Sequence, residues 1–79
     1  MNFGLALEAL KYGHKVARQG WNGKGMWIGI HKEPGEFVRE ECGTTLSYAD
    51  YIVMKTADNK LVPWLASQTD VLAEDWELV

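Results

Sequence analysis

The sequence predicts an α+β fold, in which an N-terminal helix packs on a twisted antiparallel β-sheet of four to five strands, in a homo-oligomer. Residues 2–12 carry an amphipathic helical pattern, whereas residues 26–32 and 51–64 carry alternating apolar positions bounded by turn residues. A chain of 79 residues makes one domain with a thin core. Residues 1–79 are therefore predicted to form a single domain.

The first helix has a start signal and a stop signal. Asn2 is a suitable N-cap, and Gly13 lies where a left-handed residue follows a helix. The apolar positions between them, spaced i, i+4 and i+7, are Phe3, Leu7 and Leu10. We predict that this helix covers one face of the sheet.

A strand at 14–18, a tight turn at Asn22-Gly23 and a strand at 26–32 are predicted to form a hairpin, because type I′ turns favour Asn-Gly. On this basis Trp21 and Trp27 are cross-strand neighbours. The second strand alternates between two faces. Met26, Ile28 and Ile30 form its core face, and Trp27, Gly29 and His31 form the other. Gly29 indicates close approach by another backbone or a ligand.

Residues 33–50 have the least regular pattern. Phe37-Val38 is predicted to be a brief strand, residues 40–45 a loop, and residues 46–51 either a helical turn or a strand entry. A segment of this length closes over a ligand, connects elements at the surface, or reaches a neighbouring subunit.

Residues 51–64 are predicted to form a second hairpin, with its turn at Asp58-Asn59 and with Pro63 marking an edge or a bulge. A polar turn at 65–70 follows, in which Ser67 and Asp70 resemble a helix-start cap. A helical turn at 71–75 and a last strand at 76–79 complete the prediction.

Small domains usually gain stability from disulfides, a metal or oligomerisation. Cys42 is the only cysteine, so an intramolecular disulfide is excluded, and His14 and His31 lack the spacing of zinc ligands. We therefore expect that oligomerisation stabilises the domain. We predict no metal site and no cofactor.

The formal net charge of −3 argues against a nucleic-acid binder that relies on phosphate contacts. Cations nevertheless cluster early in the chain, and a local positive pocket would suit a small anionic ligand. The sequence shows no signal peptide and no run of the ~20 apolar residues that a membrane span needs. We therefore expect a cytoplasmic protein without nucleic-acid or membrane partners.

The candidate site residues are chosen for nucleotide chemistry, and none of them is predicted to be catalytic. Trp21 would stack a base, which contributes about 1–3 kcal/mol. Arg18 and Lys24 would neutralise phosphates, and Asn22 would bond a base edge or a ribose hydroxyl. The predicted ligand-binding set is Arg18, Trp21, Asn22, Lys24, Met26, Ser67, Gln68, Thr69 and Asp70. Packing of the tryptophans in the core or an interface is the alternative.

Two stretches, MNFGLALEALKYGHKVARQGWNGKGM and YIVMKTADNKLVPWLASQTDVLAEDW, resemble a family of small phage and prophage proteins, whose characterised members are the second type of Thoeris anti-defence protein. The resemblance covers both ends of the chain but not residues 33–50. It implies a homotetramer of α+β subunits that binds cyclic ADP-ribose isomers made by TIR-domain immune sensors.

The resemblance implies a sponge, a protein that binds and sequesters the signal without degrading it, rather than an enzyme. Residues 1–79 would then be one nucleotide-signal-binding domain. It also implies that some relatives bind cyclic dinucleotides at separate sites. Because one chain of 79 residues cannot enclose a nucleotide well, we expect the binding sites to lie between subunits. The alternatives are a hydrolase or lyase for the same nucleotide class, a cyclic-dinucleotide sponge, and an oligomeric protein-interaction module.

Overall fold

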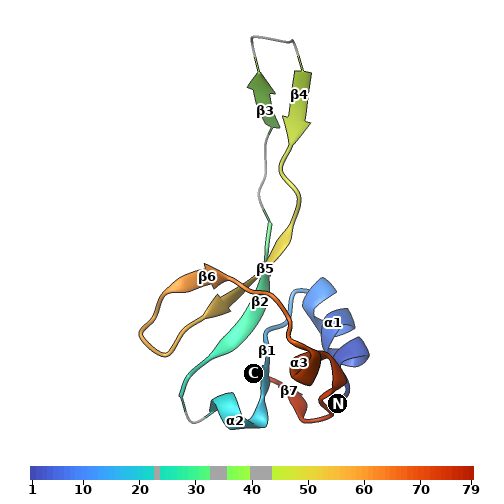
Figure 1. The fold of residues 1–79 in the computed structure, drawn as a ribbon, viewed down its shortest axis with the longest axis vertical. Coiled ribbons are helices and arrows are strands. Elements are labelled where there is room, and N and C mark those ends of the chain that lie inside the picture. The colour runs from blue at the N-terminus through green and yellow to red at the C-terminus, as the bar shows by residue number, and fades with distance from the viewer. Residues whose placement is uncertain (23, 33–35, 40–43) are drawn as a thin grey trace.

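The computed structural model describes residues 1–22, 24–32, 36–39 and 44–79. In these residues the fold is α+β, with helices beside a five-stranded antiparallel sheet in the order β6-β5-β2-β1-β7 (Figure 1), which confirms the predicted class. A separate two-stranded sheet pairs β3 with β4. The elements are α1 (Phe3–Lys11), β1 (Val16–Arg18), α2 (Gln19–Asn22), β2 (Trp27–His31), β3 (Glu36–Arg39), β4 (Thr44–Ser47), β5 (Tyr51–Lys55), β6 (Leu61–Pro63), α3 (Gln68–Leu72) and β7 (Trp76–Leu78).

The predicted ends of the first helix are confirmed. The backbone N–H of Leu5 donates to Oδ1 of Asn2 at 2.9 Å, so Asn2 is the N-cap of α1. Gly13, with φ +94°, lies in the left-handed region just after the helix ends. The α1 stripe then packs on the sheet, and Ala6 and Leu10 are fully buried.

The core lies between α1 and one face of the sheet. Its buried side chains are Ala6, Leu10, Val16, Ile28 and Trp76. The predicted alternation is confirmed for Ile28 and Ile30, which join this core, whereas Met26 lies before β2 and is not part of the core cluster of the described residues. β2 pairs with β5 along its length, from Trp27 opposite Lys55 to His31 opposite Tyr51.

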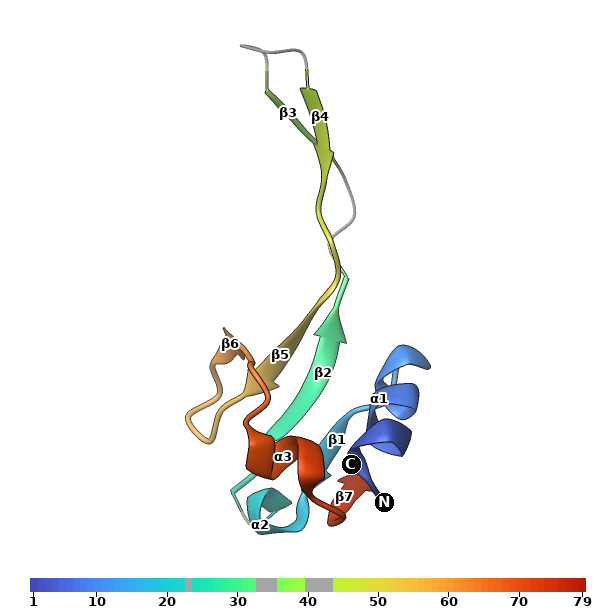
Figure 2. The ribbon, with the colours of Figure 1, turned by 45° about the vertical axis from the view of Figure 1, so that its right-hand side comes forward.

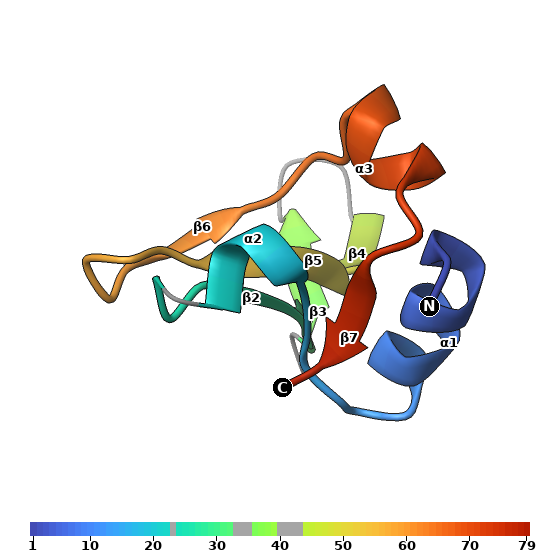
Figure 3. The same ribbon diagram turned by 90° about the horizontal axis from the view of Figure 1, so that it is seen from below.

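The opposite face of β2 and β5 carries Trp27, Gly29, His31 and Val53, and we call it the open face. α1 lies beside β7, and α3 contacts α1 and the indole of Trp76 on the core side of the sheet (Figure 3).

The last strand, β7, is central to the core although it ends the chain. It pairs with β1, with Val16 opposite Leu78 and Arg18 opposite Trp76. The amino group of Met1 donates to the carbonyl oxygen of Trp76 at 2.6 Å, and the N–H of Trp76 donates to the carbonyl of Met1 at 3.1 Å. The start of α1 and the start of β7 are therefore held together.

The two strands of the predicted first hairpin do pair, but the prediction that a tight turn connects them is wrong. β1 and β2 are antiparallel, with Val16 opposite Ile28, but the short helix α2 joins them, and Gly23 lies outside the described residues. The N–H groups of Lys24 and Met26 both donate to the carbonyl of Trp21. Trp21 packs against the core from α2, so burial of its indole outweighs the local turn preference. Trp21 and Trp27 are consequently not cross-strand neighbours.

Residues 36–39 and 44–47 form a projecting arm, which we define as β3 and β4. Phe37 pairs with Leu46 and Val38 with Thr45, so the predicted brief strand is confirmed. The predicted loop at 40–45 is wrong for Thr44 and Thr45, which belong to β4, and residues 40–43 lie outside the described part. The arm extends well beyond the body (Figure 2), and the molecule measures 48 × 27 × 22 Å.

The second hairpin is confirmed. β5 and β6 pair, β6 is an edge strand of the five-stranded sheet, and Pro63 lies at the end of β6. Asn59 has φ 64°, as expected for a turn residue. The predicted polar turn is wrong for residues 68–70, because α3 begins at Gln68 rather than at Val71. The predicted cap at Ser67 and Asp70 is present, and it starts the helix at once.

Candidate functional site

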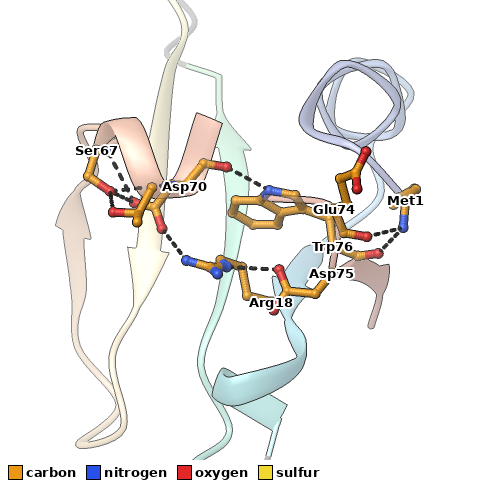
Figure 4. Close-up of polar contacts among 8 residues, drawn as sticks. Met1, Arg18, Ser67, Asp70, Glu74, Asp75 and Trp76 are labelled. Carbon is orange, nitrogen blue, oxygen red and sulfur yellow. Dashed lines mark hydrogen bonds and ion pairs between the residues drawn. The ribbon is translucent and has the colours of Figure 1, made fainter. Parts of the chain in front are cut away.

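Arg18 is the centre of a polar network at the end of β1 (Figure 4). Its Nε donates to Oδ1 of Asp75 at 2.9 Å, and its Nη1 donates to Oδ1 of Asp70 at 3.1 Å. The hydrogen bond to Asp75, followed by the one to Asp70, raises the pKa of Arg18 above its ordinary value. Arg18 is therefore a permanently charged link between three segments: β1, α3 and the residues before β7.

Asp70 also builds the start of α3. Its Oδ2 accepts from the hydroxyl of Ser67 at 2.8 Å and from the N–H of Ser67 at 3.1 Å, and its own N–H donates to Ser67 Oγ at 3.1 Å. Desolvation favours the neutral form of Asp70, but hydrogen bonds from Ser67 and Arg18 outweigh it and lower the pKa of Asp70. Asp70 is thus an ionised group with most of its acceptor capacity used inside the protein.

An aromatic cluster adjoins this network. It consists of Phe3, Trp21, Trp64 and Trp76. Trp21 meets Trp76 and Trp64 edge-on, with ring centroids 5.3 and 6.3 Å apart. The indole N–H of Trp76 donates to the carbonyl oxygen of Asp70 at 2.9 Å, which joins the cluster to α3. Trp21 is half-buried, so part of its indole is reachable from solvent.

The structure brings about half of the predicted site residues together. Arg18, Ser67 and Asp70 form one connected network, and the hydroxyl of Thr69 lies 3.1 Å from that of Ser67. Trp21 joins the same region through Trp76, which contacts Asp70. A ligand that uses Arg18 or Asp70 must therefore share it with bonds inside the chain.

The other predicted site residues are not drawn into this network. Lys24 is exposed in the turn after α2, Met26 is half-buried just before β2, and Gln68 is exposed at the start of α3. Asn22 is the last residue of α2, and its side chain lies outside the described part of the chain. The ligand-binding roles of all nine residues stay predictions.

A second feature of the structure lies on the open face, and the sequence indicates only part of it. A hollow of about 390 Å³ is lined by residues that include His14, Lys15, Trp27, Gly29, His31 and Val53. The ammonium of Lys15 lies over the indole of Trp27, 4.4 Å from the ring centroid. In the sequence, the glycine inside the strand, Gly29, indicates a close approach here. Nothing in the sequence indicates that Lys15 belongs to this site, because its position depends on the register of β1 against β2.

The described residues contain no group of three or more histidine, cysteine or acidic side chains arranged to hold a metal ion. None of the helices in the described ranges is long and apolar enough to cross a membrane. The arrangement offers cations, indole surfaces and backbone donors, which is chemistry for holding an anionic, partly aromatic molecule.

Comparison with known proteins gives the chain a family. A family model described as a Thoeris anti-defense 2-like domain matches residues 1–79, the whole chain. A protein of Bacillus phage SP01 named Thoeris anti-defense 2 is 44% identical over an alignment of 89 residues, which covers 100% of this chain and 94% of that relative. The likeness therefore includes the arm as well as the two ends. The chain belongs to the Thoeris anti-defense 2-like family.

Proposed function

We propose that this protein is an anti-defence sponge. It binds a cyclic ADP-ribose-type signal made by TIR-domain immune proteins, holds it without degrading it, and so keeps the Thoeris effector inactive. The observation that carries the proposal is the family match over the whole chain, together with the 44% identity to a phage protein named for action against Thoeris defence. Family membership itself supports an anti-defence role.

The chemistry beside Arg18 supports a nucleotide ligand. Trp21 offers an indole that is half-buried, and Lys24 is an exposed cation in the turn that follows it. An indole face suits a base and an ammonium suits a pyrophosphate. Arg18 adds a second cation, although its two carboxylate partners already balance its charge.

The exposed apolar side chains support a homo-oligomer, which we take to be a tetramer. Tyr12, Leu65 and Leu72 are 84%, 92% and 77% exposed in the single chain. Large apolar groups at that exposure on so small a domain favour contact with further copies. Subunit contacts would also enclose a nucleotide more completely than one chain does, and tight binding without turnover benefits from a closed pocket.

The test is to incubate the protein with lysate from cells whose TIR-domain sensor has been activated, and then to denature it and identify the released ligand by mass spectrometry. We expect a cyclic ADP-ribose isomer, chemically unchanged, at a fixed ratio to the protein. Recovery of an opened or hydrolysed nucleotide favours an enzyme. A cyclic dinucleotide in its place favours the alternative sponge, and recovery of no nucleotide contradicts the proposal.

A further inference from the structure

The open face of the sheet is built differently from the core face. Trp27, Gly29 and His31 of β2 point to it, and Val53 of β5 lies beside Gly29 in the ladder. The hollow there has a volume of about 390 Å³, which lies within the range of small-molecule sites. Leu10 and Gly13 line the hollow from the end of α1, and Ile30 lines it from β2.

Gly29 provides the room in which the Trp27 indole lies. A Cβ at Gly29 would be 3.4 Å from Cζ3 of Trp27 and 3.8 Å from Cγ of Lys15. The indole and the lysine stem therefore both rest against the bare backbone of β2. This explains the glycine inside a strand as clearance for two side chains of the hollow.

The ammonium of Lys15 lies over the indole of Trp27, 4.4 Å from the ring centroid, and no ion pair joins it to a carboxylate of the described residues. Lys55 on the same face differs, because its ammonium already donates to the carbonyl of Gly25 at 2.7 Å. Lys15 thus presents a positioned charge whose donors remain available to an anion.

The other residues that line the hollow also suit an anionic, partly aromatic ligand. His14 and Lys32 are exposed at its margin, and His31 is half-buried within it. The described lining residues include no aspartate or glutamate, although the chain carries a net charge of −3. Glu77 of β7 shares this face of the sheet but does not line the hollow. Its apolar surface comes from Leu10, Trp27, Ile30, Val53 and Leu61. A site of this kind fits a molecule with a phosphate at one end and a flat ring at the other.

We propose that this hollow is a binding site for a pyrophosphate-bearing nucleotide, with Lys15 as its anion-binding group and Trp27 as its apolar wall. The proposal deepens the proposed function and rests on it for the identity of the natural ligand. It moves phosphate recognition from Arg18, whose charge is balanced by Asp70 and Asp75, to Lys15, which forms no ion pair with the described residues.

The decisive variant is Lys15→Met, which keeps the apolar stem against Gly29 and Trp27 and removes the charge. Lys11→Met is the matched control, since Lys11 is an exposed lysine at the end of α1 that does not line the hollow. Lys15→Arg restores the charge. Calorimetry measures the affinity of each protein for a cyclic ADP-ribose isomer, for linear ADP-ribose and for pyrophosphate. Circular dichroism checks that each variant is folded.

We expect Lys15→Met to weaken binding of the cyclic isomer about tenfold or more, with Lys11→Met within about twofold of the parent and Lys15→Arg largely restored. Unchanged affinity in Lys15→Met overturns the site while leaving the sponge intact. If the parent binds pyrophosphate or ADP-ribose through Lys15 but not the cyclic isomer, the site stands and the proposed function fails. If the parent binds none of the three probes, both proposals fail.

The indole N–H signals in an NMR spectrum give a readout that a merely structural role would not move. Titration with pyrophosphate should shift the Trp27 signal, which Trp27→Phe identifies, more than the Trp21 signal. A larger shift at Trp21 would place the anion beside Arg18 and contradict the open-face site.

Discussion

Arg18 and Asp70 form an ion pair of 3.1 Å that joins the end of β1 to the first turn of α3. The side chain of Asp70 is only 15% exposed, and its second oxygen accepts two hydrogen bonds from Ser67. One carboxylate thus begins a helix and fixes that helix to the sheet. Asp70 therefore contributes to stability both through the cap and through the ion pair.

Replacement of Asp70 by asparagine should destabilise the fold by about 1–3 kcal/mol, because it weakens the capping box and removes the ion pair together. Chemical denaturation monitored by tryptophan fluorescence measures the loss. Asp75→Asn is the matched control. Asp75 is 35% exposed and bonds Arg18 without capping a helix, so its loss should stay below about 1 kcal/mol. Equal losses in both variants would contradict the separate capping role of Asp70.

The free energy of unfolding should also decrease at low pH, because Asp70 becomes protonated. Desolvation raises its pKa, but the hydrogen bonds from Ser67 and Arg18 prevail, so the folded-state pKa lies below the ordinary value of 3.8. A group with a lowered folded pKa stabilises the protein fully above its unfolded value, and the contribution is lost as the pH falls through the folded value. The free energy of unfolding should therefore decrease below about pH 4.

The comparison for this acid effect is Asp70→Asn across the same pH range. The pKa of Asp58 is also lowered, chiefly by a hydrogen bond from Thr56, and Asp58 is present in both proteins. The difference between the two pH curves consequently isolates Asp70. Parallel curves would show that Asp70 titrates alike in the folded and unfolded chains.

The elements that the sequence predicts correctly are those with signals close in sequence. Asn2 and Gly13 mark the ends of α1, and Ser67 with Asp70 marks the start of α3. Alternation along β2 is enough to assign Ile28 to the core and Gly29 to the other face. These features need only short-range rules of capping and strand period.

The features that were missed depend on contacts between distant segments. α2 replaces the expected hairpin because Trp21 packs on Trp64 and Trp76, both of which lie near the other end of the chain. The Arg18–Asp70 pair likewise follows from the place of α3 beside the sheet rather than from any local motif. Lys15 meets Trp27 only through the register of β1 on β2.

Trp21 provides a test that separates binding from packing. Its edge-on contacts mean that Trp21→Ala should cost about 2–4 kcal/mol, so lost binding in that variant alone would be ambiguous. Trp21→Phe keeps a ring in the cluster. If Trp21 stacks a base, this variant should lose affinity severalfold with its assembly state unchanged, as measured by calorimetry and size-exclusion chromatography.

The same pair of measurements addresses the protein-interaction alternative. Dissociation of the assembly in Trp21→Phe, with ligand affinity per folded chain preserved, would make Trp21 an interface anchor. Unchanged affinity and unchanged assembly would leave Trp21 as a packing residue of the aromatic cluster.

Lys24 gives the cleanest test of phosphate recognition beside α2, because its side chain is exposed and no ion pair joins it to the described residues. Lys24→Ala should change the free energy of unfolding by less than about 0.5 kcal/mol. If Lys24 contacts a ligand phosphate, the variant should lose affinity for the cyclic ADP-ribose isomer, and its affinity should depend less on salt than that of the parent. Lys60→Ala is the control, since Lys60 is an exposed lysine 3.5 Å from Asp58 in the second hairpin. Parental affinity and salt dependence in Lys24→Ala, combined with loss in Lys15→Met, would assign the anion to the open face rather than to the turn after α2.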